Sequence, residues 1–248
     1  MDIPRIFTIS ESAHRIHNPF TPEKYATLGR VLRLTPEMHI LDLGSGSGEM
    51  LCTWARDHRI TGLGIDLSPL FTRQAKARAQ ELGVSDRVAF IHDDAAGYVS
   101  ETLCDIAACI GATWIAGGVE GTLALLRKSL KPDGIMLIGE PYWRRQPESL
   151  AVVKACGLDA FEALRMLPDL VGLFDEQGYD VVEMVLADRE GWDRYEAAKW
   201  LTLRRWLAEN SDDAFAAEVR AELSAAPKRH VSHTREYLGW GVFALMPR

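Results

Sequence analysis

Three glycines at alternate positions, Gly44, Gly46 and Gly48, form the stretch of this chain that is best suited to bind a ligand. Glycine has no Cβ, so it can adopt a positive φ and lets a ligand approach the backbone closely. The apolar run at 40–43 before them is long enough for a buried strand but too short for a helix. The residues at 49–55 after them have apolar side chains at helical spacing. The sequence therefore predicts a strand, a glycine turn and a helix, with a ligand lying against the turn.

The spacing of the glycines distinguishes between two kinds of ligand. A dinucleotide-binding fingerprint, G-x-G-x-x-G, would need a glycine at position 49, where Glu49 would instead repel a pyrophosphate. The pattern Asp42-x-Gly44-x-Gly46-x-Gly48 resembles motif I of the class I S-adenosylmethionine (SAM) dependent methyltransferases, whose cofactor carries an amino group and a sulfonium in place of phosphates. The resemblance implies that SAM is bound by Asp42, Gly44, Ser45, Gly46 and Gly48. The simpler alternative is a glycine turn that binds no ligand.

Acidic residues follow two further predicted strands, and the resemblance assigns both of them to SAM. Asp66 ends the second predicted strand, where the matching acid of the family accepts hydrogen bonds from the ribose hydroxyls, and Leu67 stands beside it. Asp94-Ala95 follows the third predicted strand and resembles the pair that reads adenine, although Asp93 takes that role if the motif is shifted by one residue. The alternatives are that Asp66 caps the next helix and that Asp94 forms a turn.

The stretch at 110–114, after the fourth predicted strand, occupies the position of motif IV in the family. It lacks the Asn/Asp-Pro-Pro-aromatic sequence of the DNA enzymes that methylate base amines, and no acidic pair accompanies it. The resemblance therefore indicates neither a nucleic-acid base, nor a metal-dependent catechol-type site, nor a protein arginine. It assigns Ile110 to the cofactor and leaves room for a small-molecule acceptor.

No catalytic residue is identified from the sequence. A general base is needed only if the acceptor is a hydroxyl, a thiol or a protonated amine. His14 and His17, in the N-terminal segment, have a suitable unperturbed pKa, and Tyr142 follows the fifth predicted strand. These three residues are candidates, and the alternative for the histidines is a solvated surface position.

A pair of histidines near the C-terminus has the spacing of metal ligands on a helix. His230 and His233 are three residues apart, but Pro227 and the polar run at 228–234 predict a loop instead. We therefore predict no metal site.

Composition and charge narrow the class of partner. The chain has 248 residues, of which 47% are hydrophobic, as expected of a globular protein with a full core. Its net charge is −7 and no Lys/Arg stripe accompanies an aromatic series, so no nucleic-acid partner is predicted. Four cysteines without a CxxC pair fit a reduced, cytoplasmic setting. Neither a signal peptide nor a membrane span is visible, and the sequence says nothing of the oligomeric state.

Strands and helices alternate along most of the chain. Strands are predicted at 38–43, 60–67, 87–92, 105–110, 135–138, 179–185 and 237–246. Helices are predicted at 21–32, 49–55, 68–83, 118–130, 147–155, 158–177, 192–207 and 212–224, while 1–20 shows no regular pattern. The alternation predicts an α/β fold: a doubly wound, mostly parallel, seven-stranded Rossmann-like sheet with helices on both faces and a helical lid or insertion. Ligands of such sheets bind beyond the carboxyl ends of the strands, where the assigned residues fall.

These patterns predict one methyltransferase domain over 1–248. Residues 1–35 would form an N-terminal lid and helix, 36–145 the cofactor-binding core, and 146–248 the substrate-side helices and the last two strands. The resemblance implies transfer of the SAM methyl group to a small-molecule acceptor. The alternative is a module that binds SAM or S-adenosylhomocysteine without catalysis, and turnover would distinguish the two.

Overall fold

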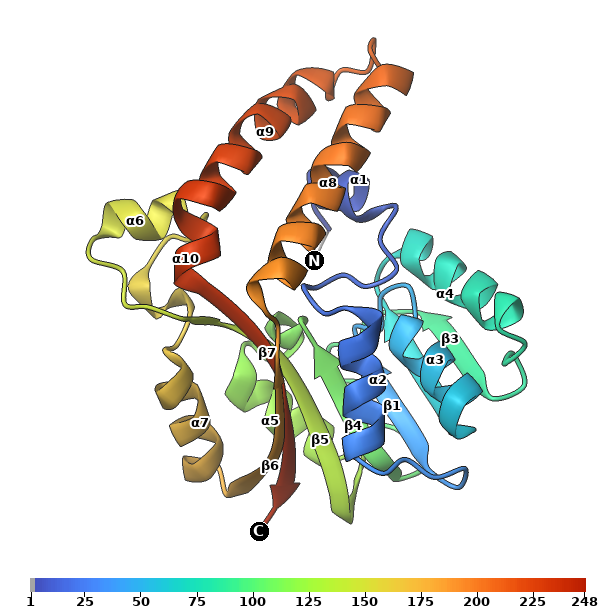
Figure 1. Ribbon diagram of the computed structural model, residues 1–248. Helices are drawn as coiled ribbons and strands as arrows, with labels where there is room; N and C mark the ends of the chain where they lie inside the picture. The colour runs from blue at the N-terminus through green and yellow to red at the C-terminus, as the bar shows by residue number, and fades with distance from the viewer. Residues whose placement is uncertain (1–2) are drawn as a thin grey trace.

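The computed structural model describes residues 3–248, which fold around one seven-stranded sheet (Figure 1). The strands are β1 (His39–Leu43), β2 (Thr61–Asp66), β3 (Val88–His92), β4 (Cys104–Ile110), β5 (Leu130–Trp143), β6 (Tyr179–Leu186) and β7 (Leu238–Pro247). Their order is β3-β2-β1-β4-β5-β7-β6, and β7 is antiparallel to both of its neighbours while the other pairs are parallel. The predicted Rossmann-like, mostly parallel α/β fold is confirmed.

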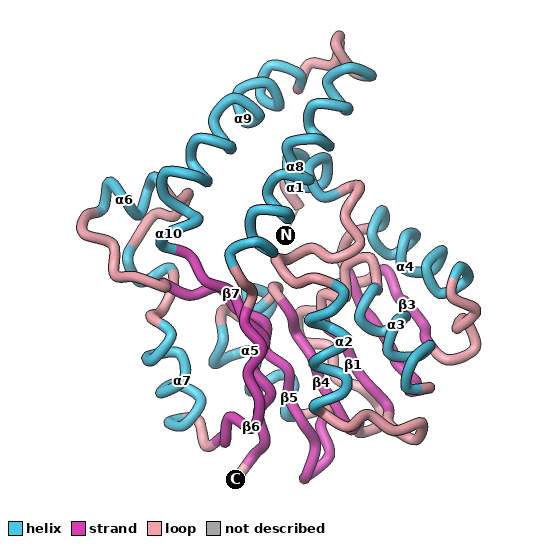
Figure 2. The backbone as a smooth tube through the Cα atoms, viewed as in Figure 1, coloured by secondary structure: helices cyan, strands magenta, loops and turns pink. Residues whose placement is uncertain are grey.

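Helices cover both faces of the sheet and extend beyond one of its edges (Figures 1 and 2). They are α1 (Arg5–Glu11), α2 (Pro22–Val31), α3 (Glu49–His58), α4 (Pro69–Glu81), α5 (Val119–Arg127), α6 (Leu150–Ala155), α7 (Leu167–Glu176), α8 (Arg189–Glu209), α9 (Ala216–Arg229) and α10 (Arg235–Tyr237). The predicted helix starts at 21 and 68 are confirmed, because Thr21 and Ser68 cap α2 and α4, each with a proline next.

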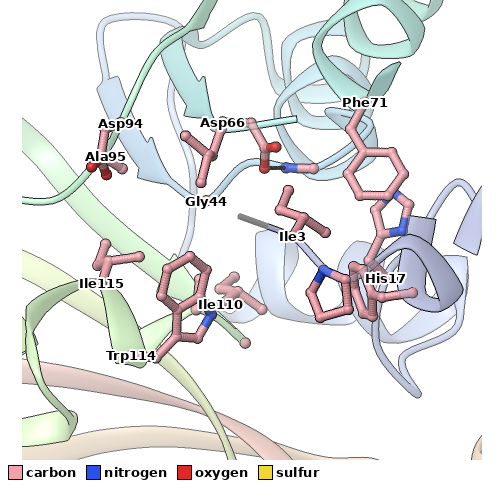
Figure 3. Close-up of a pocket in the computed structure, with 16 residues that line it drawn as sticks. Ile3, His17, Gly44, Asp66, Phe71, Asp94, Ala95, Ile110, Trp114 and Ile115 are labelled. Carbon is pink, nitrogen blue, oxygen red and sulfur yellow. Dashed lines mark hydrogen bonds between the residues drawn. The ribbon is translucent and has the colours of Figure 1, made fainter. Parts of the chain in front are cut away.

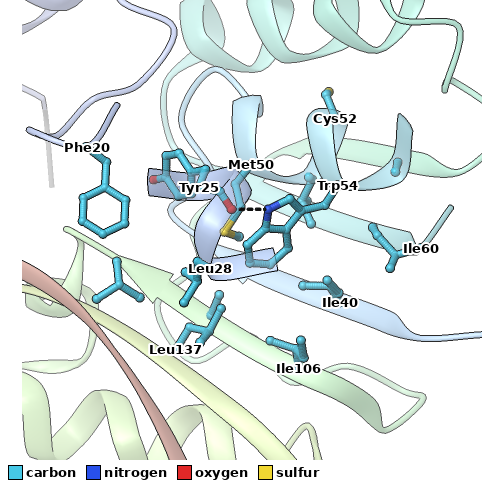
Figure 4. Close-up of a cluster of buried hydrophobic side chains, with 14 of the residues drawn as sticks. Phe20, Tyr25, Leu28, Ile40, Met50, Cys52, Trp54, Ile60, Ile106 and Leu137 are labelled. Carbon is cyan, nitrogen blue, oxygen red and sulfur yellow. Dashed lines mark hydrogen bonds between the residues drawn. The ribbon is translucent and has the colours of Figure 1, made fainter. Parts of the chain in front are cut away.

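Alternation along the strands divides the core into two layers. Neighbouring strand residues point to opposite faces of a sheet. Ile40 and Ile106 pack in the layer with α2, α3 and α4, whereas Leu41 and Ala107 pack in the layer with α5 and α7. Figure 4 shows the first layer, which centres on Trp54. Both faces of the central strands are thus buried, which explains their continuous apolar runs.

Helices α1, α8 and α9 form a separate structure above the carboxyl ends of the strands. They share a small apolar cluster of their own, built on Ile9, Leu203, Leu207 and Val219. In Figure 1, α8 and α9 run as an antiparallel pair away from the sheet, and α1 lies against α8. This arrangement places a helical roof over the edge at which parallel sheets bind ligands.

Several predicted boundaries are wrong. The unpatterned segment at 1–20 contains α1, which has no side-chain cap and depends on packing against α8. The predicted loop at 228–234 is helical: α9 continues through Pro227 and leads into a π-helical turn, His230–Thr234. A wider turn of this kind accommodates an irregular hydrogen-bond ladder after a proline. The helix expected at 212–224 begins only at 216, and Asp213 precedes it, accepting a hydrogen bond from the backbone N–H of Phe215.

The helix expected at 158–177 is also interrupted. A 3₁₀ turn, Phe161–Ala163, comes first, and α7 begins at Leu167. The fifth strand is longer than its apolar run at 135–138, because its second half pairs with β7 along Glu140–Trp143.

Within residues 3–248, no helix combines the length and the apolar character that a bilayer span requires.

Substitution of Trp54 tests the first core layer. Its side chain is 1% exposed, and its indole N–H donates to the carbonyl of Tyr25 at 3.0 Å. We expect Trp54→Ala to lower the free energy of unfolding by about 3–5 kcal/mol, because it leaves a large cavity. Leu201→Ala, at a residue that is 51% exposed, should change it by less than about 0.5 kcal/mol. Equal losses in urea denaturation of the two variants would contradict the described packing.

Candidate functional site

Two cavities of functional interest lie at the carboxyl edge of the sheet, and residues of the N-terminal segment line both of them. The first has a volume of about 330 Å³ and is walled by the loops after β1, β2, β3 and β4 (Figure 3). Residues of the N-terminal segment close it from above: Ile3, Pro4 and Phe7. Loops of four strands and a covering segment thus surround one space, as expected for the binding site of such a sheet.

The glycine turn has the backbone geometry that the sequence predicts. Gly44, Gly46 and Gly48 have φ values of 78°, 54° and 72°, which side chains rarely tolerate. Gly44 and Gly46 line the first cavity. Gly48 lies behind the turn, where a Cβ would come within 2.6 Å of the Phe90 ring, so its missing side chain serves packing.

Asp66 joins two loops beneath the first cavity. One carboxylate oxygen accepts the backbone N–H of Gly46 at 2.7 Å, and the other accepts that of Ser68 at 2.8 Å. Burial raises the pKa of Asp66, although these two hydrogen bonds act to lower it. Each oxygen keeps a second lone pair, so the carboxylate can still accept hydrogen bonds from a diol in the cavity. The capping role and the ribose role predicted for Asp66 are therefore compatible.

The far wall of the first cavity combines one acid with apolar side chains. Leu67, Ala95, Ile110, Trp114 and Ile115 provide the apolar surface. Asp94 lines the cavity while Asp93 does not, which favours Asp94 as the residue that reads adenine. Asp94 also forms the predicted turn, because its Oδ1 accepts the backbone N–H of Ala96 at 2.9 Å. An apolar wall that also carries an acid fits a purine with an amino group.

Asp42 faces a smaller cleft of about 40 Å³ behind the glycine turn, next to Ser45 and Gly46. Its Oδ1 is buried and has no hydrogen-bond partner in the protein. Burial and the negative charge of Asp66 raise the pKa of Asp42 to about 7. A buried carboxylate without a partner is unfavourable, so this oxygen is suited to a cationic or hydrogen-bond-donating group of a ligand.

Glu49 is the acid whose expected repulsion of a pyrophosphate spoke against a dinucleotide ligand. In the structure its negative charge is paired with Arg78. Arg78 donates two hydrogen bonds to its carboxylate, both at 2.8 Å, and both side chains are largely buried. A bidentate pair of this kind compensates most of the negative charge. The repulsion predicted from the sequence is therefore weaker than expected, and the preference for an amino-acid moiety depends instead on Asp42.

The second cavity, of about 870 Å³, lies beneath the helical roof. Most of its walls come from three segments outside the strand–helix core, namely 1–20, 145–178 and 187–230. The remaining lining residues are Gly111, Pro141, Thr234 and two residues of β7, Leu238 and Trp240. Aromatic side chains contribute to the walls, namely Phe7, Trp192, Tyr195, Trp200 and Trp240, and charged side chains of α8 and α9 also line the cavity. Phe7, His17 and Gly111 line both cavities, so the two spaces meet at these residues.

The three candidate bases lie in different surroundings in the structure. His17 lies at the junction of the cavities, but both ring nitrogens have partners, in Glu11 and Ser47. His14 is buried beside Tyr195 and is not among the residues that line either cavity. Tyr142 is buried in the second core layer, where burial raises its pKa. The assignment of a base to any of them stays a prediction.

Sequence reasoning missed the residues of the roof. Glu11, Tyr195 and Lys199 come together from α1 and α8, which are distant in the sequence. No local motif marks them, and only the contact between the two helices reveals the cluster. Within residues 3–248, no group of three or more potential metal ligands lies together, and all four cysteines are free and buried.

Comparison with known proteins agrees with this geometry. A family described as "Methyltransferase domain" matches residues 40–134. The chain is 72% identical to YjhP of Escherichia coli K12 over the full length of both proteins, and YjhP is described as uncharacterized. The crystal structure of YjhP superposes on this chain with a TM-score of 0.98 and covers 99% of this chain and 100% of that one. A SAM-dependent methyltransferase from Geobacter sulfurreducens in complex with S-adenosylhomocysteine is 67% identical (TM-score 0.98, 100% of this chain and 99% of that one). A SAM-dependent methyltransferase from Thiobacillus denitrificans, also with S-adenosylhomocysteine, is 66% identical (TM-score 0.97, 100% of both chains).

The hydrogen bonds of Asp66 make a prediction about stability. Asp66→Ala leaves the N–H groups of Gly46 and Ser68 without their acceptor, at a cost of about 1–3 kcal/mol for each buried donor. We expect urea denaturation without ligand to show a loss of about 2 kcal/mol or more. Asp86→Ala, at an exposed acid, is the control and should change stability by less than about 0.5 kcal/mol. Unchanged stability of Asp66→Ala would mean that the two loops do not depend on this carboxylate.

Proposed function

Because the chain belongs to the class I SAM-dependent methyltransferases, we propose that it transfers a methyl group to a small-molecule acceptor bound in the second cavity. SAM is the cofactor. The observation that supports the proposal is the shared wall of the two cavities at Phe7, His17 and Gly111. A cofactor in the first cavity and an acceptor in the second would meet there.

The residues of the first cavity fit SAM in three places. Asp66 would hold the ribose hydroxyls, and Asp94 would accept the adenine amino group above the apolar wall. Asp42, with its buried unpartnered oxygen, would accept the amino group of the methionine part. The glycine turn lets the ligand approach the backbone at Gly44 and Gly46.

When bound, SAM supplies a methyl group that its sulfonium activates for in-line displacement. The protein therefore has to orient the acceptor and exclude water, and such orientation is worth up to about 7–11 kcal/mol in well-aligned systems. Phe7 and Gly111 line both cavities, so the methyl group would pass from cofactor to acceptor beside an apolar ring and a residue without a side chain. The aromatic walls of the second cavity would hold the acceptor by its apolar body.

A base at the junction is not required by this proposal. His17 has both nitrogens engaged there, so an acceptor that already carries a free lone pair near neutral pH would react without proton transfer. The cytoplasmic location stays a prediction from the cysteine pattern. Binding of SAM without catalysis is the alternative function, and turnover separates the two.

The acceptor cavity can be blocked without touching the cofactor site. Ala225 of α9 lines the second cavity, whereas Ala217 of the same helix does not. We expect a panel of small metabolites, assayed by S-adenosylhomocysteine formation, to yield an acceptor whose turnover falls about tenfold or more in Ala225→Trp. Ala217→Trp is the matched control and should retain turnover, and both variants should bind S-adenosylhomocysteine normally. Equal turnover by the two variants would place the acceptor elsewhere, and failure of every acceptor despite cofactor binding would favour the binding module.

The raised pKa of Asp42 predicts how cofactor binding depends on pH. Its amino-group partner prefers the carboxylate, which is protonated in the free protein below a pKa of about 7. Binding must then expel a proton, so SAM affinity should fall by up to about tenfold for each pH unit below 7 and level off above it. Calorimetry of the wild type against Asp42→Asn checks this, because the variant has no carboxylate to titrate. A wild-type affinity that is flat with pH would exclude Asp42 as the partner of the amino group.

A further inference from the structure

Glu11, the last residue of α1, has a fully buried carboxylate with partners from several parts of the chain. Its side chain is 0% exposed. Tyr195 donates a hydrogen bond to Oε1 at 2.6 Å, and the ammonium of Lys199 lies 3.5 Å from the same oxygen. Oε2 lies 3.1 Å from Nδ1 of His17 and 3.7 Å from Nδ1 of His14. A buried charge is tolerated only while its partners stay in place, so these contacts fix the end of α1.

The protonation states of Glu11 and Tyr195 follow from their surroundings. Burial alone would raise the pKa of Glu11, but the hydrogen bond from His17 and the charge of Lys199 outweigh it and hold this pKa below its ordinary value. Burial raises the pKa of Tyr195 well above its ordinary value. The phenol therefore keeps its proton and donates to an ionised carboxylate.

The hydrogen bonds on the far side of His17 fix the protons of its ring. Gln74 donates its Nε2–H to the carbonyl of Ser12 at 2.7 Å, so its Oε1 faces Ser47. An amide oxygen only accepts, so the hydroxyl of Ser47 donates to it at 2.7 Å. Ser47 must then accept from Nε2 of His17 at 2.8 Å, while Nδ1 donates to the carboxylate of Glu11. In this arrangement both ring nitrogens of His17 act as donors, Nε2 to Ser47 and Nδ1 to the carboxylate of Glu11.

This pair stands where the two cavities meet. The ring of His17 packs on the glycine turn so closely that a Cβ at Gly46 would lie 2.6 Å from it, and it lies against Phe71 with ring centroids 4.1 Å apart (Figure 3). Tyr195 lines the second cavity, and Ser47 belongs to the glycine turn. The chain of hydrogen bonds from Tyr195 to Ser47 therefore runs from the acceptor side to the cofactor side.

The other contacts of α1 are of a different kind. Ile9 adds one side chain to the small cluster of the roof. Arg5 pairs with Asp213 at 2.6 Å, with 53% and 28% of the two side chains exposed. Exposed pairs contribute little, about 0–1 kcal/mol, whereas breaking a buried pair leaves an uncompensated charge. The Glu11–His17 pair is thus a buried, charged contact between α1 and the cofactor site, and it stands beside the hydrogen bond from Gln74 to the carbonyl of Ser12 and the edge contact of Phe7 with Phe71.

We propose that Glu11 and His17 are positioning residues whose ion pair latches α1 over bound SAM and ties the acceptor cavity to the glycine turn. This rests on the proposed placement of the cofactor in the first cavity. With the latch formed, Ile3, Pro4 and Phe7 cover that cavity. Release of the cofactor product past Ile3, Pro4 and Phe7 then requires these residues to move, so breaking the ion pair should make that release faster.

The test measures release of S-adenosylhomocysteine by stopped-flow competition. We expect Glu11→Gln and His17→Gln each to raise the dissociation rate constant about tenfold or more, because either change breaks the charged pair. Arg5→Gln, on the same helix but outside both cavities, is the matched control and should stay within about twofold of the wild type. In addition, ¹⁵N spectra of the histidines at about pH 7 should show hydrogen on both nitrogens of His17, and on only one in Glu11→Gln.

The rate measurement and the ¹⁵N spectra together support or overturn the proposed latch. Faster release in both latch variants, with the ¹⁵N signature lost in Glu11→Gln, supports it. Should Glu11→Gln fail to fold, His17→Gln carries the same rate measurement, because it breaks the same ion pair. Tight wild-type binding with unchanged release in the folded variants overturns the latch alone. Wild-type protein that binds no S-adenosylhomocysteine overturns both the latch and the proposed cofactor site.

Discussion

The carboxylate of Asp66 ties the end of β2 to the loop of the neighbouring strand, and the cofactor side of the molecule is built on this contact. It accepts one backbone N–H from the glycine turn and one from the start of α4. The turn makes a second attachment at the same place, because the N–H groups of Gly44 and Ser45 both donate to the carbonyl of Ile65. Hydrogen bonds of a side chain and of the backbone therefore hold together two loops that follow adjacent parallel strands.

The absence of side chains in the glycine turn allows close packing within the protein as well as close approach of a ligand. A Cβ at Gly44 would meet Ala112, one at Gly46 would meet His17, and one at Gly48 would meet Phe90, each at 2.6 Å. The turn is thus confined on three sides as well as held from below by Asp66. A glycine pattern that the sequence explains by ligand approach is also a packing pattern, and the second role is the one that fits Gly48.

The floor of the site, meaning the sheet and the loops that follow β1 to β4, could be predicted from the sequence. The roof formed by α1, α8 and α9 could not be predicted, for a physical reason. Asp66 ends a strand that is largely buried, and Asp94 comes two residues after the edge strand β3, so the local strand pattern locates both acids. Helix starts at Thr21 and Ser68 carry their own caps. By contrast, α1 has no cap and is held by contacts with residues far along the chain. The continuation of α9 through Pro227 likewise goes against a local signal.

The floor and the roof also differ in the interactions that stabilise them, and this difference determines which of the two can move. The floor belongs to two large apolar layers, which are close-packed and resist small rearrangements. The roof has only a small apolar cluster of its own, and its contacts with the floor near the junction combine the polar groups around Glu11 and His17 with the packing of Phe7 and His17 on Phe71. Such contacts are directional: they are strong in one geometry and lost in others. A roof attached in this way can adopt a defined closed position and still open, while the floor keeps the geometry that cofactor chemistry needs.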